Sequence, residues 1–265
     1  MLEKNMKEPI LTQHRILKVN MRRNSVQFFD DDIVVESRIS LYINSHHYSI
    51  MSLTPFEIKE FTVGHLIAEG IINKLDEIVE LKIDKKRVDV QLNIEPRMGE
   101  TRFISIECGS KEIKINPQLW MKLKKQISPG RFFPQAIMKA VRNLNLSAET
   151  YRKTGGTHAA AIMDKQGCIL AVSEDISRHC AVDKVIGKAA LQDLNFKEVF
   201  LTSTGRVTSG IIIKTINVGI PLVVSFSAPT DKGIRLADMM ELTLIGFARG
   251  ARFNIYTHPE RIILH

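Results

Sequence analysis

The stretch that decides the fold runs from Thr154 to Lys184 and reads TGGTHAAAIMDKQGCILAVSEDISRHCAVDK. Two glycines stand between Thr154 and Thr157, an apolar run follows His158, and Glu-Asp, Arg-His and Asp-Lys pairs come after it. Glycine allows a ligand to approach the backbone closely, and the paired polar side chains can bind anions or transfer protons. The stretch therefore predicts the lip of a binding pocket set between core segments.

The elements around this stretch predict a layered α/β sheet in the C-terminal half. Two apolar runs around the turn Asp164–Gly167 are typical of a β-hairpin. Helices and strands then alternate, which favours a sheet with helices packed on it. The predicted elements are helix Pro134–Leu144, strands Ala159–Met163 and Cys168–Val172, helix Arg178–Leu194, strand Val199–Leu201, helix Val207–Asn217, strand Pro221–Ser225, helix Lys232–Glu241 and strand Thr243–Phe247.

The N-terminal half is predicted to be a β-rich α+β part. Apolar and polar residues alternate from Val88 to Ile94, and similar runs occur between Ile33 and Ile43. One helix is expected between them, because Thr54 can cap it, with Pro55 at its first position and Glu57 completing a capping box. We expect this helix to end near Gly70 and a further strand over Phe103–Glu107.

The chain is thus expected to have three parts. Residues 1–107 form the β-rich N-terminal part with one helix, residues 108–131 a mobile loop or linker that carries Cys108, and residues 132–265 the α/β domain. The middle part is rich in Lys, Gly, Ser and Pro and has weak periodicity, which is typical of a linker.

Composition narrows the class of protein. The formal net charge of +8, from 37 basic and 29 acidic residues, fits a phosphate-rich ligand but also an ordinary basic protein. No apolar run approaches the ~18 residues of a membrane span, and no nucleic-acid-binding motif occurs. The N-terminus lacks the apolar core of a signal peptide, and three cysteines are too few for a disulfide framework, so we expect a cytoplasmic protein.

Three loops are predicted to follow strand ends at one edge of the sheet, where α/β proteins bind ligands. They are Ser203–Arg206 (STGR), Ser227–Thr230 (SAPT) and Phe247–Arg252 (FARGAR). Hydroxyl groups, arginines and helix N-termini favour an anionic ligand. Each loop alone could be an ordinary strand-to-helix turn, but three together favour a nucleotide-like ligand.

The order of hairpin, helices and strands is similar to the cytidine deaminase fold, but the deaminase zinc signature is missing. Ala181 stands where the catalytic glutamate would be, and no Pro-Cys-x-x-Cys follows near Ser203. We therefore expect no metal site and disfavour a nucleobase hydrolase. Cys108 differs from Cys168 and Cys180, since it follows a predicted strand beside Gly109 and near Lys111. An accessible thiol near a positive charge suits a nucleophile or sulfur carrier.

These segments together resemble the formate dehydrogenase accessory sulfurtransferases, the FdhD family. The resemblance covers most of residues 30 to 262 and is carried by TPFEIKEFTVGHLIAEGII, ECGS, TGGTHAAA, SEDISRHCAVDKVIGKAAL, STGRVTS, SAPT and LTLIGFARGARFNIYTHPERI. It implies a cytidine-deaminase-like domain without zinc. It also implies transfer of sulfur, as a persulfide on Cys108, from a cysteine desulfurase to the molybdenum or tungsten bis-guanine-dinucleotide cofactor of formate dehydrogenase.

The resemblance also implies a site and an assembly. Guanine nucleotides such as GDP or GMP should act as partial mimics of the cofactor, and the protein should be a homodimer that contacts the formate dehydrogenase catalytic subunit. The α/β domain is expected to carry the dimer contact, because its apolar helices, such as Val207–Asn217, offer more hydrophobic surface than one sheet face needs. The predicted cofactor-binding residues are Phe247, Ala248, Arg249, Gly250, Ala251 and Arg252, with Thr157, His158, Arg178, His179, Thr204 and Arg206.

One position departs from the family pattern. Many members carry Cys-Gly-x-Cys, whereas this chain reads Cys108-Gly109-Ser110-Lys111. Cys108 can still carry a persulfide, but a second thiol to relay the sulfur is missing. A chaperone that binds the cofactor without transferring sulfur therefore stays open as an alternative.

Overall fold

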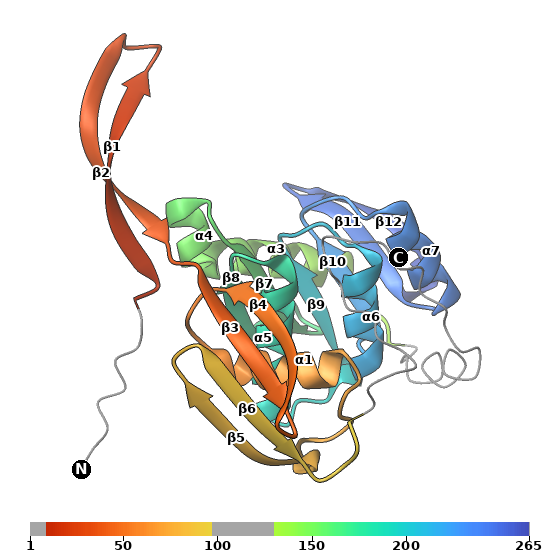
Figure 1. Ribbon diagram of the computed structural model, residues 1–265. Helices are drawn as coiled ribbons and strands as arrows, with labels where there is room; N and C mark the ends of the chain where they lie inside the picture. Colours follow the sequence, from red (N-terminus) through yellow and green to blue (C-terminus); the bar gives the residue numbers. More distant parts are fainter. Residues whose placement is uncertain (1–8, 97–129, 265) are drawn as a thin grey trace.

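The computed structural model describes residues 9–96 and 130–264, and it contains three sheets (Figure 1). A six-stranded mixed sheet forms the C-terminal half, a four-stranded sheet lies in the N-terminal half, and a two-stranded hairpin projects from the body. The N-terminal half is β-rich, and the C-terminal half is a mixed sheet with helices, as the sequence predicted.

The six-stranded sheet has the order β12-β11-β10-β9-β7-β8. Strands β9, β10 and β11 run parallel, whereas β7, β8 and β12 pair antiparallel with their neighbours. The hairpin predicted around Asp164–Gly167 is confirmed, while β12 was not predicted. The strands are β7 (His158–Asp164), β8 (Ile169–Asp175), β9 (Val199–Ser203), β10 (Leu222–Ser225), β11 (Thr243–Arg249) and β12 (Arg252–Thr257).

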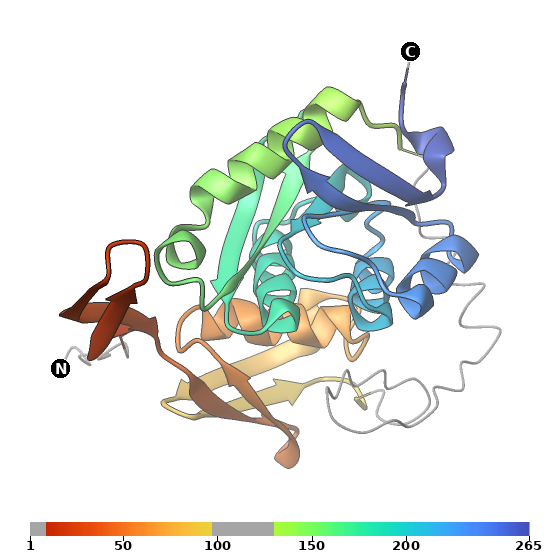
Figure 2. The same cartoon turned by 90° about the horizontal axis from the view of Figure 1, so that it is seen from above.

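Helices cover both faces of this sheet, as Figure 2 shows from above. Ala160 and Ile162 of β7 belong to the core beneath α5 (Arg178–Leu191), α6 (Ser209–Val218) and α7 (Asp231–Met239). Their neighbours Ala159 and Ala161 belong to the core beneath α3 (Pro134–Ser147), which α4 (Glu149–Thr154) follows. Successive strand residues point to opposite faces, so one short apolar run supplies both cores.

Helix α1 (Ile58–Ala68) joins the two halves. The four-stranded sheet, of order β4-β3-β6-β5, buries one apolar face against it, and α1 packs on α5 and α6. The crossing of α1 and α5 is very close, since a Cβ on Gly64 would lie 1.8 Å from the Asp183 carbonyl oxygen. The strands are β3 (Ser37–Ile43), β4 (His46–Leu53), β5 (Ile78–Asp84) and β6 (Arg87–Leu92), and the 3-10 helices are Leu75–Glu77, Phe196–Glu198 and Pro259–Arg261.

The predicted start of α1 is wrong. The helix begins at Ile58, and Glu57 before it adopts a left-handed φ of 56° and gives no side-chain cap. The Thr54 hydroxyl donates instead to a carboxylate oxygen of Asp175, 2.8 Å away. A tertiary contact with a distant segment therefore replaced the local capping box.

The prediction that helix Val207–Asn217 has spare apolar surface for a dimer contact is wrong, whereas a dimer contact of the α/β domain stays a prediction. The observed helix α6 packs against α1, α5 and α7. Its apolar residues Ile211, Ile212, Ile213 and Ile216 are all buried within the chain. The helix therefore has no apolar surface to spare for a second copy.

The remaining hairpin consists of β1 (Leu11–Asn20) and β2 (Ser25–Val34). Its base contacts α4, where Lys153 forms an ion pair with Asp32 at 2.7 Å. The rest of the hairpin extends away from the body (Figure 1). The predicted strand Phe103–Glu107, Cys108 and nearly all of the proposed linker lie outside the described residues.

Candidate functional site

The site is built at the edge of the sheet where the parallel strands end. Strands β9, β10 and β11 run parallel, so the loops after them meet at this edge. Strand β7 is antiparallel to β9, which places His158 at its start beside the end of β9. Helices α5, α6 and α7 also begin here, and helix N-termini favour negatively charged ligands.

Hydrogen bonds tie the STGR and SAPT loops together. The Ser227 hydroxyl donates to the Thr204 carbonyl oxygen at 2.8 Å, and the Ser225 hydroxyl donates to the Gly205 carbonyl oxygen at 2.6 Å. The Val207 N–H donates to the Ala228 carbonyl oxygen at 3.2 Å. The structure thus brings together two of the three predicted loops and joins them by hydrogen bonds.

Thr204 links the STGR loop to the TGGTH segment. Its hydroxyl oxygen accepts from the Ala159 N–H at 3.0 Å and lies 3.4 Å from Nδ1 of His158. Gly205 lies against Arg178, because a Cβ on this glycine would be 2.7 Å from the Arg178 Cβ. His158, Arg178 and Thr204, which lie far apart in sequence, therefore lie close together in space.

His179 completes this cluster as a neutral side chain. Burial, followed by the positive charges of Lys214 and Arg178, lowers the pKa of His179 to about 3. The ring therefore stays neutral at physiological pH and can exchange hydrogen bonds without adding charge. The positive charge of this cluster comes from Arg178 and from the N-terminus of α5, which the Ser177 side chain caps.

Thr157 is placed differently from the prediction that it faces a ligand. It is buried, and its hydroxyl donates to a Glu174 carboxylate oxygen at 3.0 Å. The same carboxylate accepts from the backbone N–H groups of Thr150 and Tyr151 at 2.9 and 2.5 Å. Glu174 thereby fixes the TGGTH segment against α4, and Thr157 positions His158.

The FARGAR segment forms the hairpin between β11 and β12. The Phe247 N–H donates to the Ser227 carbonyl oxygen at 3.1 Å, which attaches this strand to the SAPT loop. Ala248 is fully buried, so its side chain cannot meet a ligand. Arg249, Gly250, Ala251 and Arg252 line a shallow open depression at the tip, and Arg206 is likewise exposed.

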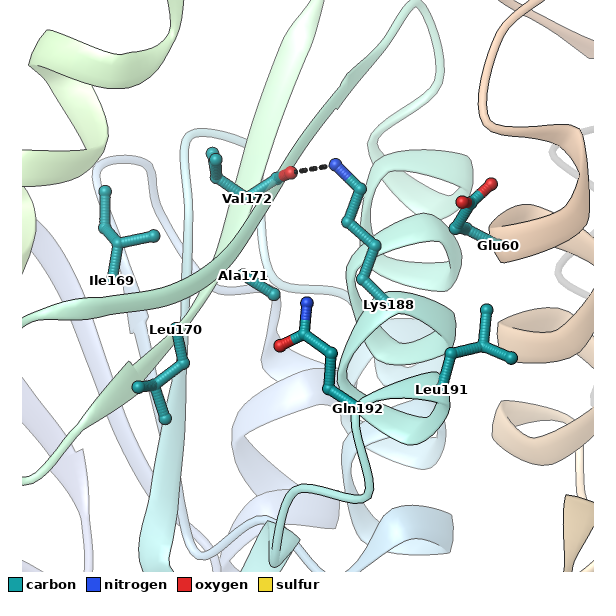
Figure 3. A pocket seen from close by; sticks show the side chains of 8 residues that line it. All are labelled: Glu60, Ile169, Leu170, Ala171, Val172, Lys188, Leu191 and Gln192. Atoms are coloured by element: carbon teal, nitrogen blue, oxygen red, sulfur yellow. Dashed lines mark hydrogen bonds between the residues drawn. The ribbon is translucent and has the colours of Figure 1, made fainter.

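A second pocket lies elsewhere (Figure 3). It lies between β8 and the C-terminal half of α5, where Lys188 donates to the Val172 carbonyl oxygen at 2.6 Å. Arg178 and Lys188 are ten residues apart on α5, which corresponds to about 15 Å along the helix. None of the predicted site residues lines this pocket.

Sequence reasoning missed the buried ion pairs of helix α5, the helix whose first turn carries Arg178 and His179. The Lys214 ammonium lies 2.7 Å from Asp183 and 2.5 Å from Glu69, and Nδ1 of His65 lies 2.9 Å from Asp183. Lys184 forms a second buried pair with Asp175 at 2.6 Å. The sequence does carry one signal of these buried charges, since Lys214 stands inside the apolar run IIIKTI.

The two described cysteines are poorly placed for chemistry at this edge. Cys180 is buried, and burial raises the pKa of its thiol far above the usual range. Cys168 stands just before β8, at the end of that strand remote from Asp175, with its sulfur 3.0 Å from Nζ of Lys139. Among the described residues no group of three or more His, Cys, Asp or Glu side chains could hold a metal ion.

One protein family combines this sheet with these edge loops and their sequence segments. The FdhD/NarQ family model matches residues 34–263, and the chain belongs to this family. It is 34% identical over 244 residues to the sulfur carrier protein FdhD of Methanothermobacter thermautotrophicus, covering 88% of this chain and 92% of that protein. The sulfur carrier protein FdhD of Bacillus subtilis is 30% identical over 239 residues, covering 88% and 91%.

A solved structure shares the fold. It is the crystal structure of a candidate formate dehydrogenase accessory protein from Desulfotalea psychrophila, with a TM-score of 0.78 and 23% identity. The match covers 96% of this chain and 100% of that one. In the described part of this chain, no helix has the length and apolar character needed to cross a membrane.

Proposed function

We propose that this protein is a cytoplasmic sulfur carrier that takes sulfur from a cysteine desulfurase and delivers it to the bis-guanine-dinucleotide cofactor of formate dehydrogenase. The observation that carries the proposal is the cluster of His158, Arg178 and Thr204 at the N-terminus of α5, within a family whose relatives are named sulfur carrier proteins. The C-terminal half would be a cytidine-deaminase-like domain whose sheet edge binds the cofactor as a substrate.

The edge suits the phosphate groups of guanine nucleotides. Arg178 supplies a forked donor and the first turn of α5 supplies backbone N–H groups, while buried Thr204 holds its hydroxyl group against Ala159 and His158. Arg206 and Arg249 are exposed at the same edge and would attract the ligand's charge. Neutral His179 would contact the ligand without competing for phosphate.

The sulfur-carrying step is assigned to Cys108. Its thiolate would attack the outer sulfur of the desulfurase persulfide, so that a new S–S bond forms at Cys108. The donor's S–S bond breaks, and the donor cysteine leaves as a thiolate. The properties of the other cysteines support this assignment, since Cys180 is buried with a raised pKa and Cys168 lies away from the edge.

Mass spectrometry after incubation with a cysteine desulfurase and cysteine tests the carrier role. We expect one added sulfur atom, retained in Cys168→Ala and lost in Cys108→Ala. An adduct that survives in Cys108→Ala would refute the assignment. Formate dehydrogenase that matures with Cys108→Ser would favour the non-catalytic chaperone instead, for which the missing second loop thiol leaves room.

Calorimetry with GDP tests the site. Arg178→Ala should weaken binding by roughly tenfold or more, since a charge-assisted hydrogen bond contributes ~1.5–3 kcal/mol. The matched control is Arg142→Ala, which removes an exposed arginine from α3. Equal losses in both variants would show that only net charge matters, and no GDP binding at millimolar concentration would contradict the site.

A further inference from the structure

The TPFE segment, residues Thr54–Glu57, joins β4 to α1 and lies along one face of α5. The ammonium group of Lys184 lies 4.1 Å from the centre of the Phe56 ring, and that of Lys188 lies 2.5 Å from a carboxylate oxygen of Glu57. Lys184 and Lys188 are four residues apart, so they stand on the same face of the helix. Lys188 also donates to a backbone carbonyl oxygen of β8 at 2.6 Å (Figure 3), so these contacts tie the segment to both α5 and β8.

Asp175 is the residue through which the TPFE segment contacts the start of α5. Its Oδ2 accepts from the N–H and the hydroxyl group of Thr54, at 3.1 and 2.8 Å, and pairs with the Lys184 ammonium at 2.6 Å. Its Oδ1 accepts from the N–H of Ser177 at 2.9 Å. Thr54, Asp175 and Lys184 are each 0% exposed. One buried carboxylate therefore bonds the TPFE segment with one oxygen and the start of α5 with the other.

Asp175 also stands beside residues of the candidate site. It pairs with His158 across β7 and β8, and it lies three residues before Arg178. Ser177, which donates to its Oδ1, is the residue whose side chain caps α5. A shift of this carboxylate would therefore move the first turn of α5 and the start of β7 together.

Stability alone explains this network poorly. A buried ion pair can often be replaced by apolar residues of similar volume without loss of stability, because removing charges from water is unfavourable. The left-handed φ of 56° at Glu57 is also unfavourable, since this residue has a Cβ. Strained backbone persists where the surrounding contacts fix it, and it is typical of functional sites. The network is therefore better explained by the geometry that it imposes on the edge of the sheet.

We propose that Thr54 and Asp175 are positioning residues for the anion-binding edge. They hold the first turn of α5 in place so that Arg178 meets the phosphate groups of the ligand, and neither side chain touches the ligand itself. The inference rests on the proposed function, because the ligand is the same guanine-dinucleotide cofactor. It makes binding by the C-terminal half depend on a segment of the N-terminal half, and it gives a role to the TPFE segment, which the site does not otherwise use.

The experiment is GDP calorimetry on the full chain, with melting temperatures measured on the same samples. Thr54→Val removes the hydroxyl group and keeps the volume, and it should weaken GDP binding about tenfold, the scale of one misplaced charge-assisted hydrogen bond. Thr54→Ser restores the hydroxyl group and should recover most of the affinity. The matched control is Thr215→Val, which removes an equally buried hydroxyl group that donates to the Ile211 carbonyl oxygen of α6. That control should keep the wild-type GDP affinity even where its melting temperature falls.

A double variant tests whether the two residues act as a unit. Asp175→Asn should weaken GDP binding at least as much as Thr54→Val, and combining the two should add little, because both changes break the same contact. Additive losses would overturn the shared role. If Asp175→Asn does not fold, the comparison of Thr54→Val with Thr54→Ser carries the test alone.

The positioning role and the site itself fail in different ways. Unchanged GDP affinity in folded Thr54→Val, equal losses in Thr54→Val and Thr215→Val, or no recovery in Thr54→Ser would each overturn the positioning role and leave the site in place. A wild type that does not bind GDP would instead contradict the site, and the positioning role with it.

Discussion

Gly187→Ala should destabilise the protein and weaken its site at the same time, because the crossing of α1 and α5 has no room for a methyl group. A Cβ on Gly187 would lie 1.8 Å from the carbonyl oxygen of Glu60 and 2.8 Å from the backbone nitrogen of Gly64. Both neighbours are backbone atoms of α1, so no side chain can rotate away. The two helices would have to move apart by about 1.5 Å to restore ordinary van der Waals contact.

The loss of stability in Gly187→Ala can be worked out from this clash. Overpacking of a core usually costs ~1–3 kcal/mol, and we expect at least the upper value because the helices must move as bodies. Their separation would also stretch the contacts of Asp183 with Lys214 and His65. A loss of about 3 kcal/mol corresponds to a fall in melting temperature of roughly 6–12 °C for a chain of this size.

The assay is thermal and urea unfolding, combined with GDP calorimetry on the folded variant. Helix α5 carries Arg178 and His179 at its first turn, so its displacement should also lower GDP affinity. The control is Gly155→Ala, where φ is 66° but no atom lies within 4 Å of the new Cβ. The free energy of unfolding of that variant should fall by only ~1–2 kcal/mol, because of backbone strain. A Gly187→Ala protein as stable as the wild type would refute the close-crossing argument.

Three further predictions follow from the site and its support. Because the pKa of His179 falls from 6.5 in the unfolded chain to about 3 in the folded one, the unfolded state binds the extra proton below pH 6.5. As the pH falls from 6 to 4, the free energy of unfolding of the wild type should fall by about 1.4 kcal/mol per pH unit relative to that of His179→Gln, as measured by urea unfolding. Equal pH dependence of the two proteins would contradict this. Lys214→Met should lower the free energy of unfolding by ~3–5 kcal/mol, because it leaves buried carboxylates uncompensated. Adding Asp183→Asn should recover part of that loss, and a double variant less stable than the single one would argue against the ion pair. Gly205→Ala should reduce GDP affinity by about tenfold (~1.4 kcal/mol), since its Cβ would lie 2.7 Å from the Arg178 Cβ and displace that residue. Unchanged affinity in the folded variant would remove Arg178 from the site.

The apolar patterns along the chain were enough to predict most elements of the C-terminal half. The run around Ala160 carries small apolar residues for both faces of a sheet, and the turn at Gly167 requires a positive φ of 75°. The alternation of strands and helices after Arg178 can be predicted locally, because the spacing of apolar residues that indicates a helix or a strand involves neighbouring residues only. The meeting of the STGR and SAPT loops at one edge follows from that alternation. The strand order, with β7 beside β9 and β12 at the edge, was not predicted.

What sequence patterns could not reveal depends on contacts between distant residues. Thr54 has every feature of a helix cap, yet it bonds Asp175, which lies 121 residues away. Lys214 stands in an apolar run, and only packing shows that Asp183 and Glu69 surround it. Ala248 and Thr157 belong to motif segments, but tertiary packing buries their side chains. The residue types at the site were therefore determined by the sequence alone, whereas the side chains that face a ligand were decided by long-range packing, because burial depends on the whole fold rather than on neighbouring residues.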